Sequence, residues 1–155
     1  MPRREIRTQI GIEAAPEEVW RVLADFGAFP EWNPLIREIS GEAKPGARLR
    51  VTIQPPGASP MAFQPTVTAC EPLRELRWLG RVLIPGLLDG EHSFAIQALG
   101  PRRVRFLHAE TFTGLLVPFF GGMLEKTRQG FEEMNRALKA RVEKARRAET
   151  CSEPG

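Results

Sequence analysis

The C-terminal third of the chain has a helical periodicity that limits the fold more than any other feature. After Pro118, the side chains of one face recur at steps of three and four residues across residues 119–147, which predicts one long helix. This face comprises Phe120, Leu124, Thr127, Phe131, Met134, Leu138 and Val142. At 1.5 Å per residue the helix would be roughly 40 Å long. Because 155 residues fit a single domain, the helix must cross most of that domain.

Seven strand-length segments precede this helix. The first, residues 4–13, alternates Ile6, Thr8, Ile10 and Ile12 on one face. Turn residues separate six later segments, which we expect at 37–40, 48–54, 62–71, 75–82, 88–98 and 104–112. A single antiparallel sheet buries one face, and the long helix is the only large element left to cover it. The pattern therefore predicts a sheet that curls around the helix.

Residues 15–34 connect the first strand to the others. Pro16 suits a first helical turn, and Glu17 and Glu18 suit a helix N-terminus, so a short helix is predicted over 16–25. Gly27, Pro30 and Pro34 then favour a turn or a second short helix. The helix and turn contain the string V-W-x-V-L-x-D-F-x-x-F-P-x-W-N-P, and E-T-F-T-G-L-L follows at 110–116.

These two strings, placed in this order of elements, resemble the START-like (SRPBCC) superfamily and, within it, the polyketide cyclase/dehydrase-like group. The resemblance covers residues 6–142. It implies an α+β helix-grip fold of the birch-pollen-allergen type. A seven-stranded curved antiparallel sheet would wrap around the long C-terminal helix, with two short helices after the first strand. We expect one domain over residues 1–148 and a disordered polar tail over 149–155. This fold encloses an apolar cavity, which implies a small hydrophobic ligand.

Titratable side chains interrupt the apolar faces of two neighbouring strands. His92 falls in the apolar set of 88–98, while His108 and Glu110 fall in that of 104–112. If the Gly100-Pro101 turn keeps the strands in register, His92 lies beside Glu110 and His108 beside Phe94. A histidine next to a carboxylate can act as a general acid or base. In the alternative interpretation, His92 and Glu110 form a buried polar pair without a catalytic role.

Other catalytic arrangements have little support. Ser93 and Thr111 have the opposite parity, so no Ser/His/acid triad forms, and two histidines without a third ligand predict no metal site. No cofactor is expected. If the chain is an enzyme, the site would contain His92 as acid or base, Glu110 orienting it, and His108 contacting the substrate. The activity implied by the resemblance is then that of a cyclase or dehydratase.

Aromatic and methionine side chains are candidates to line the cavity. They are Trp32, Phe63, Trp78, Phe94, Phe106, Phe112, Met123, Phe131 and Met134. Each is also open to interpretation as ordinary core packing, and Trp32 as a wedge that closes one end of the sheet. Residues 55–60, 83–90 and 114–122 are candidates for a rim or lid, or for an apolar patch that pairs two copies. A monomer and a homodimer both remain open.

Composition limits the partners and the compartment. The net charge is only +3, with its excess at the two ends, and no groove-reading motif accompanies it, so nucleic-acid binding is not expected. The charged N-terminus does not resemble a secretory signal, and no apolar run is long enough to span a bilayer. Cys70 and Cys151 show no ligand spacing, which favours a cytoplasmic protein.

Three functional hypotheses remain. The first is binding of a small hydrophobic or aromatic molecule, lipid-like or polyketide-like, in the cavity. The second is catalysis by His92. The third is a protein-interaction module that uses the basic helix end, where Lys139, Arg141, Lys144, Arg146 and Arg147 lie.

Overall fold

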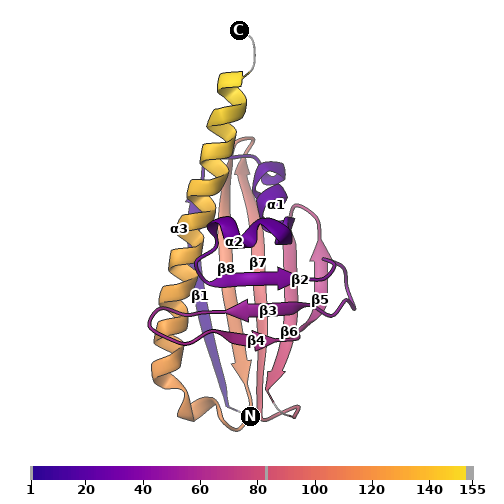
Figure 1. The fold of residues 1–155 in the computed structure, drawn as a ribbon, viewed down its shortest axis with the longest axis vertical. Coiled ribbons are helices and arrows are strands. Elements are labelled where there is room, and N and C mark those ends of the chain that lie inside the picture. The colour runs from indigo at the N-terminus through magenta and orange to yellow at the C-terminus, as the bar shows by residue number, and fades with distance from the viewer. Residues whose placement is uncertain (1, 83, 153–155) are drawn as a thin grey trace.

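The computed structural model describes residues 2–82 and 84–152 (Figure 1). Its strands are β1 (Arg3–Ile12), β2 (Ile36–Ser40), β3 (Arg50–Ile53), β4 (Met61–Phe63), β5 (Thr66–Glu71), β6 (Glu75–Val82), β7 (Leu88–Gly100) and β8 (Arg103–Thr113). Its helices are α1 (Pro16–Ala24), α2 (Phe29–Trp32) and α3 (Gly121–Ser152), with 3-10 turns η1 (Phe26–Ala28) and η2 (Val117–Phe119). The α+β class, the short helices after β1 and the long final helix agree with the prediction.

The strands form two antiparallel sheets. Five strands lie in the order β1-β8-β7-β6-β5, and β2, β3 and β4 form a second sheet that runs across them (Figure 1). The prediction of seven strands in one sheet was wrong: within the described residues there are eight strands in two sheets. The segment expected at 62–71 is divided, because Pro65 lies between β4 and β5 and has no N–H to donate to a ladder.

A few backbone hydrogen bonds join the two sheets where the chain passes between them. The carbonyl of Pro65 accepts from Leu49 N at 2.8 Å, and the carbonyl of Val67 accepts from Gly46 N at 2.8 Å. Val67 N in turn donates to the carbonyl of Ala47 at 2.8 Å. The β2–β4 layer is therefore fixed to the β5 edge of the larger sheet.

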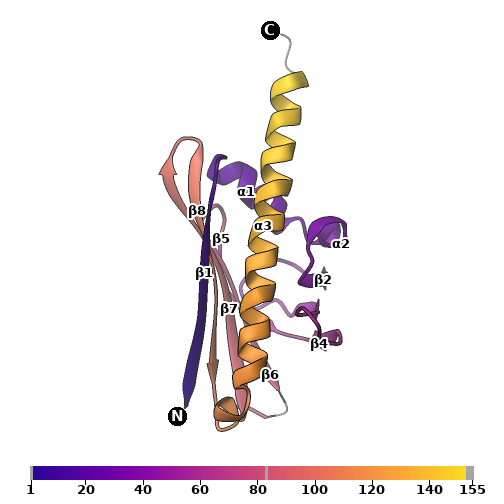
Figure 2. The same cartoon turned by 90° about the vertical axis from the view of Figure 1, so that its left-hand side faces the viewer.

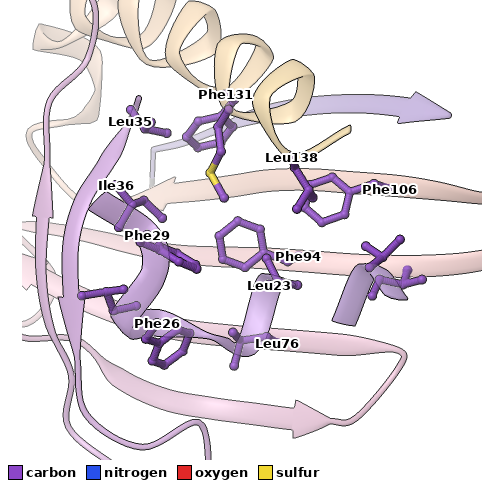
Figure 3. Close-up of a cluster of buried hydrophobic side chains, with 14 of the residues drawn as sticks. Leu23, Phe26, Phe29, Leu35, Ile36, Leu76, Phe94, Phe106, Phe131 and Leu138 are labelled. Atoms are coloured by element: carbon purple, nitrogen blue, oxygen red, sulfur yellow. The ribbon is translucent and has the colours of Figure 1, made fainter. Parts of the chain in front are cut away.

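Helix α3 runs along the β1 edge, at a depth between the two sheets, and its last turns extend past the end of the larger sheet (Figures 1 and 2). Its apolar face meets the sheets in one core, where Phe131 and Leu138 lie near Phe94 and Phe106 (Figure 3). The helix continues to Ser152, beyond the predicted end at residue 147. The tail expected over 149–155 thus overlaps the end of α3, and 153–155 lie outside the described residues.

The Trp-Asn-Pro corner orders the chain between α2 and β2. The side-chain oxygen of Asn33 accepts hydrogen bonds from the backbone N–H of Leu35 at 3.0 Å and of Ile36 at 2.8 Å. This turn, in which a side chain replaces a backbone acceptor, places both residues in the core, where they are fully buried. At the other end of this segment, Glu18 Oε1 accepts from Ala15 N at 3.0 Å and stabilises the start of α1.

Candidate functional site

The histidines lie on adjacent strands and face the core. In the β7–β8 ladder His92 is paired with Glu110, and Phe94 with His108, so the predicted register is confirmed. Both histidine side chains are buried, with exposed fractions of 1% and 0%. The β7–β8 turn thus brings both titratable positions to the inner face of the sheet.

The two imidazole rings contact each other directly across the diagonal of this ladder. His92 Nε2 lies 2.7 Å from His108 Nε2. His108 Nδ1 lies 2.9 Å from Asn135 Oδ1 on α3, and Asn135 Nδ2 donates to Thr8 Oγ1 at 2.8 Å. The Thr8 hydroxyl donates to the backbone carbonyl of His108 at 2.9 Å. A continuous buried polar chain therefore links β7, β8, α3 and β1.

His108 is held neutral by its surroundings. Burial, and secondarily the neighbouring His92, lowers the pKa of His108 well below its usual value of 6.5. Its ring is stacked on that of Phe131, with centroids 3.9 Å apart and an interplanar angle of 7°. A neutral imidazole has only one N–H, so each of its nitrogens has a defined role in the chain.

His92 and Glu110 face each other without a hydrogen bond. The distance from His92 Nδ1 to Glu110 Oε2 is 3.6 Å, and no described residue forms a hydrogen bond with that buried nitrogen. Gly90 makes room for the carboxylate: a Cβ at Gly90 would lie 2.7 Å from Glu110 Oε1. The carboxylate therefore lies over the bare backbone of β7. A ligand group that reached His92 Nδ1 could form the hydrogen bond that this nitrogen lacks.

Burial changes along the inner face at this pair. The cross-strand row Trp78–His92–Glu110 marks the boundary. On one side of it the inward-facing positions of β6, β7 and β8 are buried as far as Leu76, Ile96 and Val104, and on the other side they are only half-buried. The half-buried positions are Gly80, Val82, Leu88, Gly90 and Phe112. The titratable pair therefore lies at the edge of the packed core, where Glu110 is itself half-buried.

The predicted ligand contacts fall into two groups. Those packed inside the core are Trp78, Phe94, Phe106, Phe131 and Met134. Trp32, Phe63 and Phe112 are half-buried, while Met123 is 42% exposed at the start of α3. Figure 3 shows Phe94, Phe106 and Phe131 filling the space between sheet and helix. Their role as ligand contacts stays a prediction.

Two surface hollows lie away from the histidine pair. One, of about 660 Å³, is on the outer face of the five-stranded sheet, where Arg77 and Ser93 contribute to it. The other, of about 390 Å³, lies between β1 and α3, and Thr8 and Asn135 line it. Neither hollow is lined by His92 or Glu110. The second hollow nevertheless reaches the Thr8 end of the buried polar chain.

Two of the three predicted rim segments, 83–90 and 114–122, contact each other. Leu115 N donates to the carbonyl of Gly86 at 3.2 Å, and Leu116 N donates to that of Leu87 at 3.0 Å. Exposed apolar side chains mark this end of the molecule at Ile84, Leu115, Phe119 and Met123. Leu83 lies outside the described residues.

The basic end of α3 forms contacts within the chain. Lys139 Nζ lies 2.6 Å from Glu143 Oε2, Arg141 Nη2 lies 3.2 Å from Glu31 Oε1, and Arg146 donates to the backbone carbonyl of Glu13. The contacts of Arg141 and Arg146 hold α3 to the segments around α1 and α2, while the Lys139–Glu143 pair lies within α3. Lys139, Arg141 and Arg146 therefore have partners within the chain. They do not form an unpaired basic surface that would support the interaction-module hypothesis.

Sequence reasoning missed Asn135 and Gly90, and it listed Thr8 only as a strand residue. A signal was present: Asn135 lies four residues after Phe131, in the apolar phase of the helix, and Thr8 interrupts a row of isoleucines. Gly90 gave no such signal, because its role depends on the carboxylate opposite.

Among the described residues no group of three or more His, Cys, Asp or Glu side chains could hold a metal ion. Nor does any described helix have the length and apolar character that a bilayer span requires.

This architecture, two antiparallel sheets and a long C-terminal helix with a polar pair on the inner face, defines a helix-grip protein of the START-like superfamily. The family described as polyketide cyclase / dehydrase and lipid transport matches residues 3–143. The chain belongs to this family. A comparison with curated proteins gives no significant match.

Solved structures show the same fold at low sequence identity. A START superfamily protein from Mycobacterium smegmatis is 22% identical, with a TM-score of 0.72 over 91% of this chain and 98% of that one. The Zhui aromatase/cyclase from Streptomyces sp. R1128 is 16% identical, with a TM-score of 0.74 over 92% and 94%. Norcoclaurine synthase from Thalictrum flavum, in complex with dopamine and hydroxybenzaldehyde, is 12% identical, with a TM-score of 0.69 over 92% and 88%.

Proposed function

We propose that the chain binds a small, flat, apolar molecule with one hydroxyl or carbonyl group, between the inner face of the five-stranded sheet and α3. The observation that carries this proposal is the buried Nδ1 of His92, which has no hydrogen-bond partner among the described residues. A buried polar atom without a partner costs about 1 to 3 kcal/mol. A ligand that supplies the missing hydrogen bond would recover that free energy.

The surroundings of His92 favour an aromatic ligand. Its ring centroid lies 5.1 Å from that of Trp78, 4.7 Å from that of Phe94 and 5.0 Å from that of Phe131. Aromatic faces and edges select flat rings, and one polar group inside such a wall sets the orientation of the ligand. The family description, which includes polyketide cyclases and lipid transport, agrees with an apolar ligand.

The ligand would enter beside Glu110. Beyond the row Trp78–His92–Glu110 the inner face is half-buried, and Gly80 pairs with Gly90 across β6 and β7. The Glu110 carboxylate covers the backbone at Gly90, but a Cβ added at Gly80 would meet nothing closer than 3.8 Å, so a flat ring could lie over the backbone at Gly80. Its polar group would then meet His92 and Glu110.

A second candidate function is acid/base catalysis of a cyclase or dehydratase type. The specific observation in its favour is the distance of 3.6 Å between His92 Nδ1 and Glu110 Oε2 at the edge of the core. A carboxylate can stabilise the protonated imidazole that forms when His92 takes a proton from a bound substrate. His108 then supports His92 through their nitrogen contact, in place of touching the substrate.

Two probes test the binding proposal. Calorimetric titration of the full chain with 2-naphthol and with naphthalene separates the contribution of the hydroxyl from that of the rings. We expect 2-naphthol to bind roughly tenfold more tightly, the effect of one buried hydrogen bond. Native mass spectrometry of freshly purified protein, followed by extraction under denaturing conditions, identifies any compound that is already bound.

Matched variants decide the outcome. His92→Phe keeps a ring in the same place and should remove the preference for 2-naphthol while naphthalene still binds. Ser93→Ala alters the neighbouring residue on the outer face and should leave both affinities unchanged. Absence of binding by both probes, together with no extracted compound, would contradict the proposal. Loss of turnover of a recovered compound in His92→Phe, with binding retained, would support the catalytic candidate.

A further inference from the structure

The hydrogen bonds of the buried polar chain have a direction, which starts at Thr8. A carbonyl oxygen can only accept, so the Thr8 hydroxyl uses its single proton on the carbonyl of His108, 2.9 Å away. The contact of 2.8 Å between Thr8 and Asn135 must then be donated by the Asn135 amide. In the reverse amide orientation the Asn135 oxygen would face the Thr8 oxygen. The single hydroxyl proton of Thr8 is already donated to His108, so no hydrogen bond could form between these two oxygens.

The amide orientation of Asn135 determines which nitrogen of His108 carries the proton. Since its NH₂ group points to Thr8, its oxygen faces His108 Nδ1 at 2.9 Å and accepts the proton from that nitrogen. His108 is neutral and has only one N–H, so its Nε2 has a lone pair. The side chains of Thr8 and Asn135 thereby fix which tautomer His108 adopts.

His92 has only one way to complete the chain. Its Nε2 is 2.7 Å from His108 Nε2, and a hydrogen bond at this distance needs one proton between the two nitrogens. His108 Nε2 has none, so His92 donates. The remaining nitrogen, His92 Nδ1, is left facing Glu110 without a hydrogen bond.

We infer that Asn135 and Thr8 are positioning residues that fix the tautomers of both histidines, so that His92 meets a ligand through Nδ1. This inference deepens the proposed function, because it names the atom of His92 that the ligand contacts. It also states the chemistry of the ligand group. When His92 is neutral, Nδ1 accepts a hydrogen bond from a hydroxyl, and when Glu110 balances a proton on Nδ1, this nitrogen donates to a carbonyl.

The tautomers are directly observable. The chain contains only two histidines, so nitrogen NMR of the full chain labelled at histidine resolves four ring nitrogens, and His92→Phe assigns those of His108. We expect a protonated Nδ1 and an unprotonated Nε2 on His108, and a protonated Nε2 on His92. A protonated Nε2 on His108 in the unaltered chain would overturn the inference.

Variants separate positioning from simple packing. Asn135→Leu removes the side-chain acceptor and leaves the backbone of Phe131 as the other hydrogen-bond partner of the His108 ring, so we expect the fraction of His108 with its proton on Nδ1 to fall. Thr8→Val removes the hydroxyl at constant shape and should produce a mixture of tautomers, whereas Thr8→Ser keeps the hydroxyl and should restore the original pattern. If Asn135→Leu does not fold, the Thr8 pair decides the question. An unchanged pattern in both Asn135→Leu and Thr8→Val, or in Thr8→Val alone if the former does not fold, would refute the positioning role.

The titration with 2-naphthol links this result to binding. We expect Thr8→Val to lose most of the roughly tenfold preference over naphthalene and Thr8→Ser to retain it. The two proposals fail in different ways. If the expected tautomers are present but neither probe binds, the proposed function is wrong and the tautomer assignment stands. If the probes bind and the tautomers are reversed, binding stands and the positioning role is wrong.

Discussion

The rings of His108 and Phe131 lie parallel, 3.9 Å apart between centroids, and this stack joins β8 to α3 in the middle of the core. Phe131 is fully buried, and it also contacts the ring of His92 at 5.0 Å. One aromatic residue of α3 thus covers both histidines. Its size and position affect the stability of the fold and the environment of the polar chain together.

Phe131→Ala should lower the free energy of unfolding by about 3 to 5 kcal/mol, because it removes a fully buried ring and leaves a cavity. Chemical denaturation followed by circular dichroism measures this loss. Phe119→Ala is the control: its side chain is 79% exposed, so its effect should stay within about 0.5 kcal/mol. Equal losses in the two variants would contradict the assignment of Phe131 to the core.

Acid should destabilise the chain through His108. Its pKa is lowered in the folded state by burial and by His92, so below about pH 6.5 the unfolded chain binds a proton that the folded chain does not. Stability should therefore fall with decreasing pH, by up to about 1.4 kcal/mol per pH unit for this one proton.

The pH effect is best measured between pH 6.5 and about pH 5, above the range where most carboxylates titrate. Urea titrations at several pH values give the slope. His108→Phe removes the titrating group, so its slope should be smaller by the contribution of that proton. A slope unchanged by this substitution would show that His108 is not the group responsible.

Gly130→Ala and Gly122→Ala should have opposite effects on stability although both lie in α3. A Cβ at Gly130 would lie 2.7 Å from Leu35 Cδ1 and 3.3 Å from Pro56 Cδ, while one at Gly122 meets nothing within 4 Å. Alanine gains up to about 1 kcal/mol over glycine in a helix. We expect Gly122→Ala to raise the melting temperature and Gly130→Ala to lower it. If the melting temperature rises in both variants, the segment around Leu35 must shift at little cost to accommodate the added methyl group.

Gly90→Ala should displace the Glu110 carboxylate with little loss of stability, because the contact of 2.7 Å falls on the end of a flexible side chain. The preference for 2-naphthol over naphthalene should then decrease. The same substitution in a Glu110→Ala background should have no such effect, since the displaced group is absent. An equal decrease in both backgrounds would show that the added methyl group blocks the ligand directly.

Local patterns predicted the parts of the fold that depend on neighbouring residues. Alternation places His92 and Glu110 on the same face, while their direct pairing also depends on the register shift between Ala98 and Gly100 beside the β7–β8 turn. The break at Pro65 was visible as a proline inside a strand pattern. After this break the chain moves from one sheet to the other. That change depends on contacts with the β2–β3 hairpin, which lies far from Pro65 in the sequence.

The candidate site could be predicted only in part. Alternation places both histidines on one face, but their nitrogen contact is diagonal and depends on side-chain rotamers. The apolar phase of α3 turns Asn135 toward the core, but the residue that it meets there depends on how the helix is placed along the sheet, which no spacing within the helix determines. The sequence therefore indicates the polar positions and leaves their partners to tertiary packing.

The pairing of β1 with β8 has a consequence for how the chain folds. Arg3 pairs with Thr113, and Ile12 with Val104, so the first strand finds its partner only after about two thirds of the chain has followed it. During synthesis β1 must wait, unpaired, until β8 has left the ribosome. Because contacts so distant in sequence slow folding, we expect the larger sheet to form late, with β1 as its last strand to gain protection from hydrogen exchange.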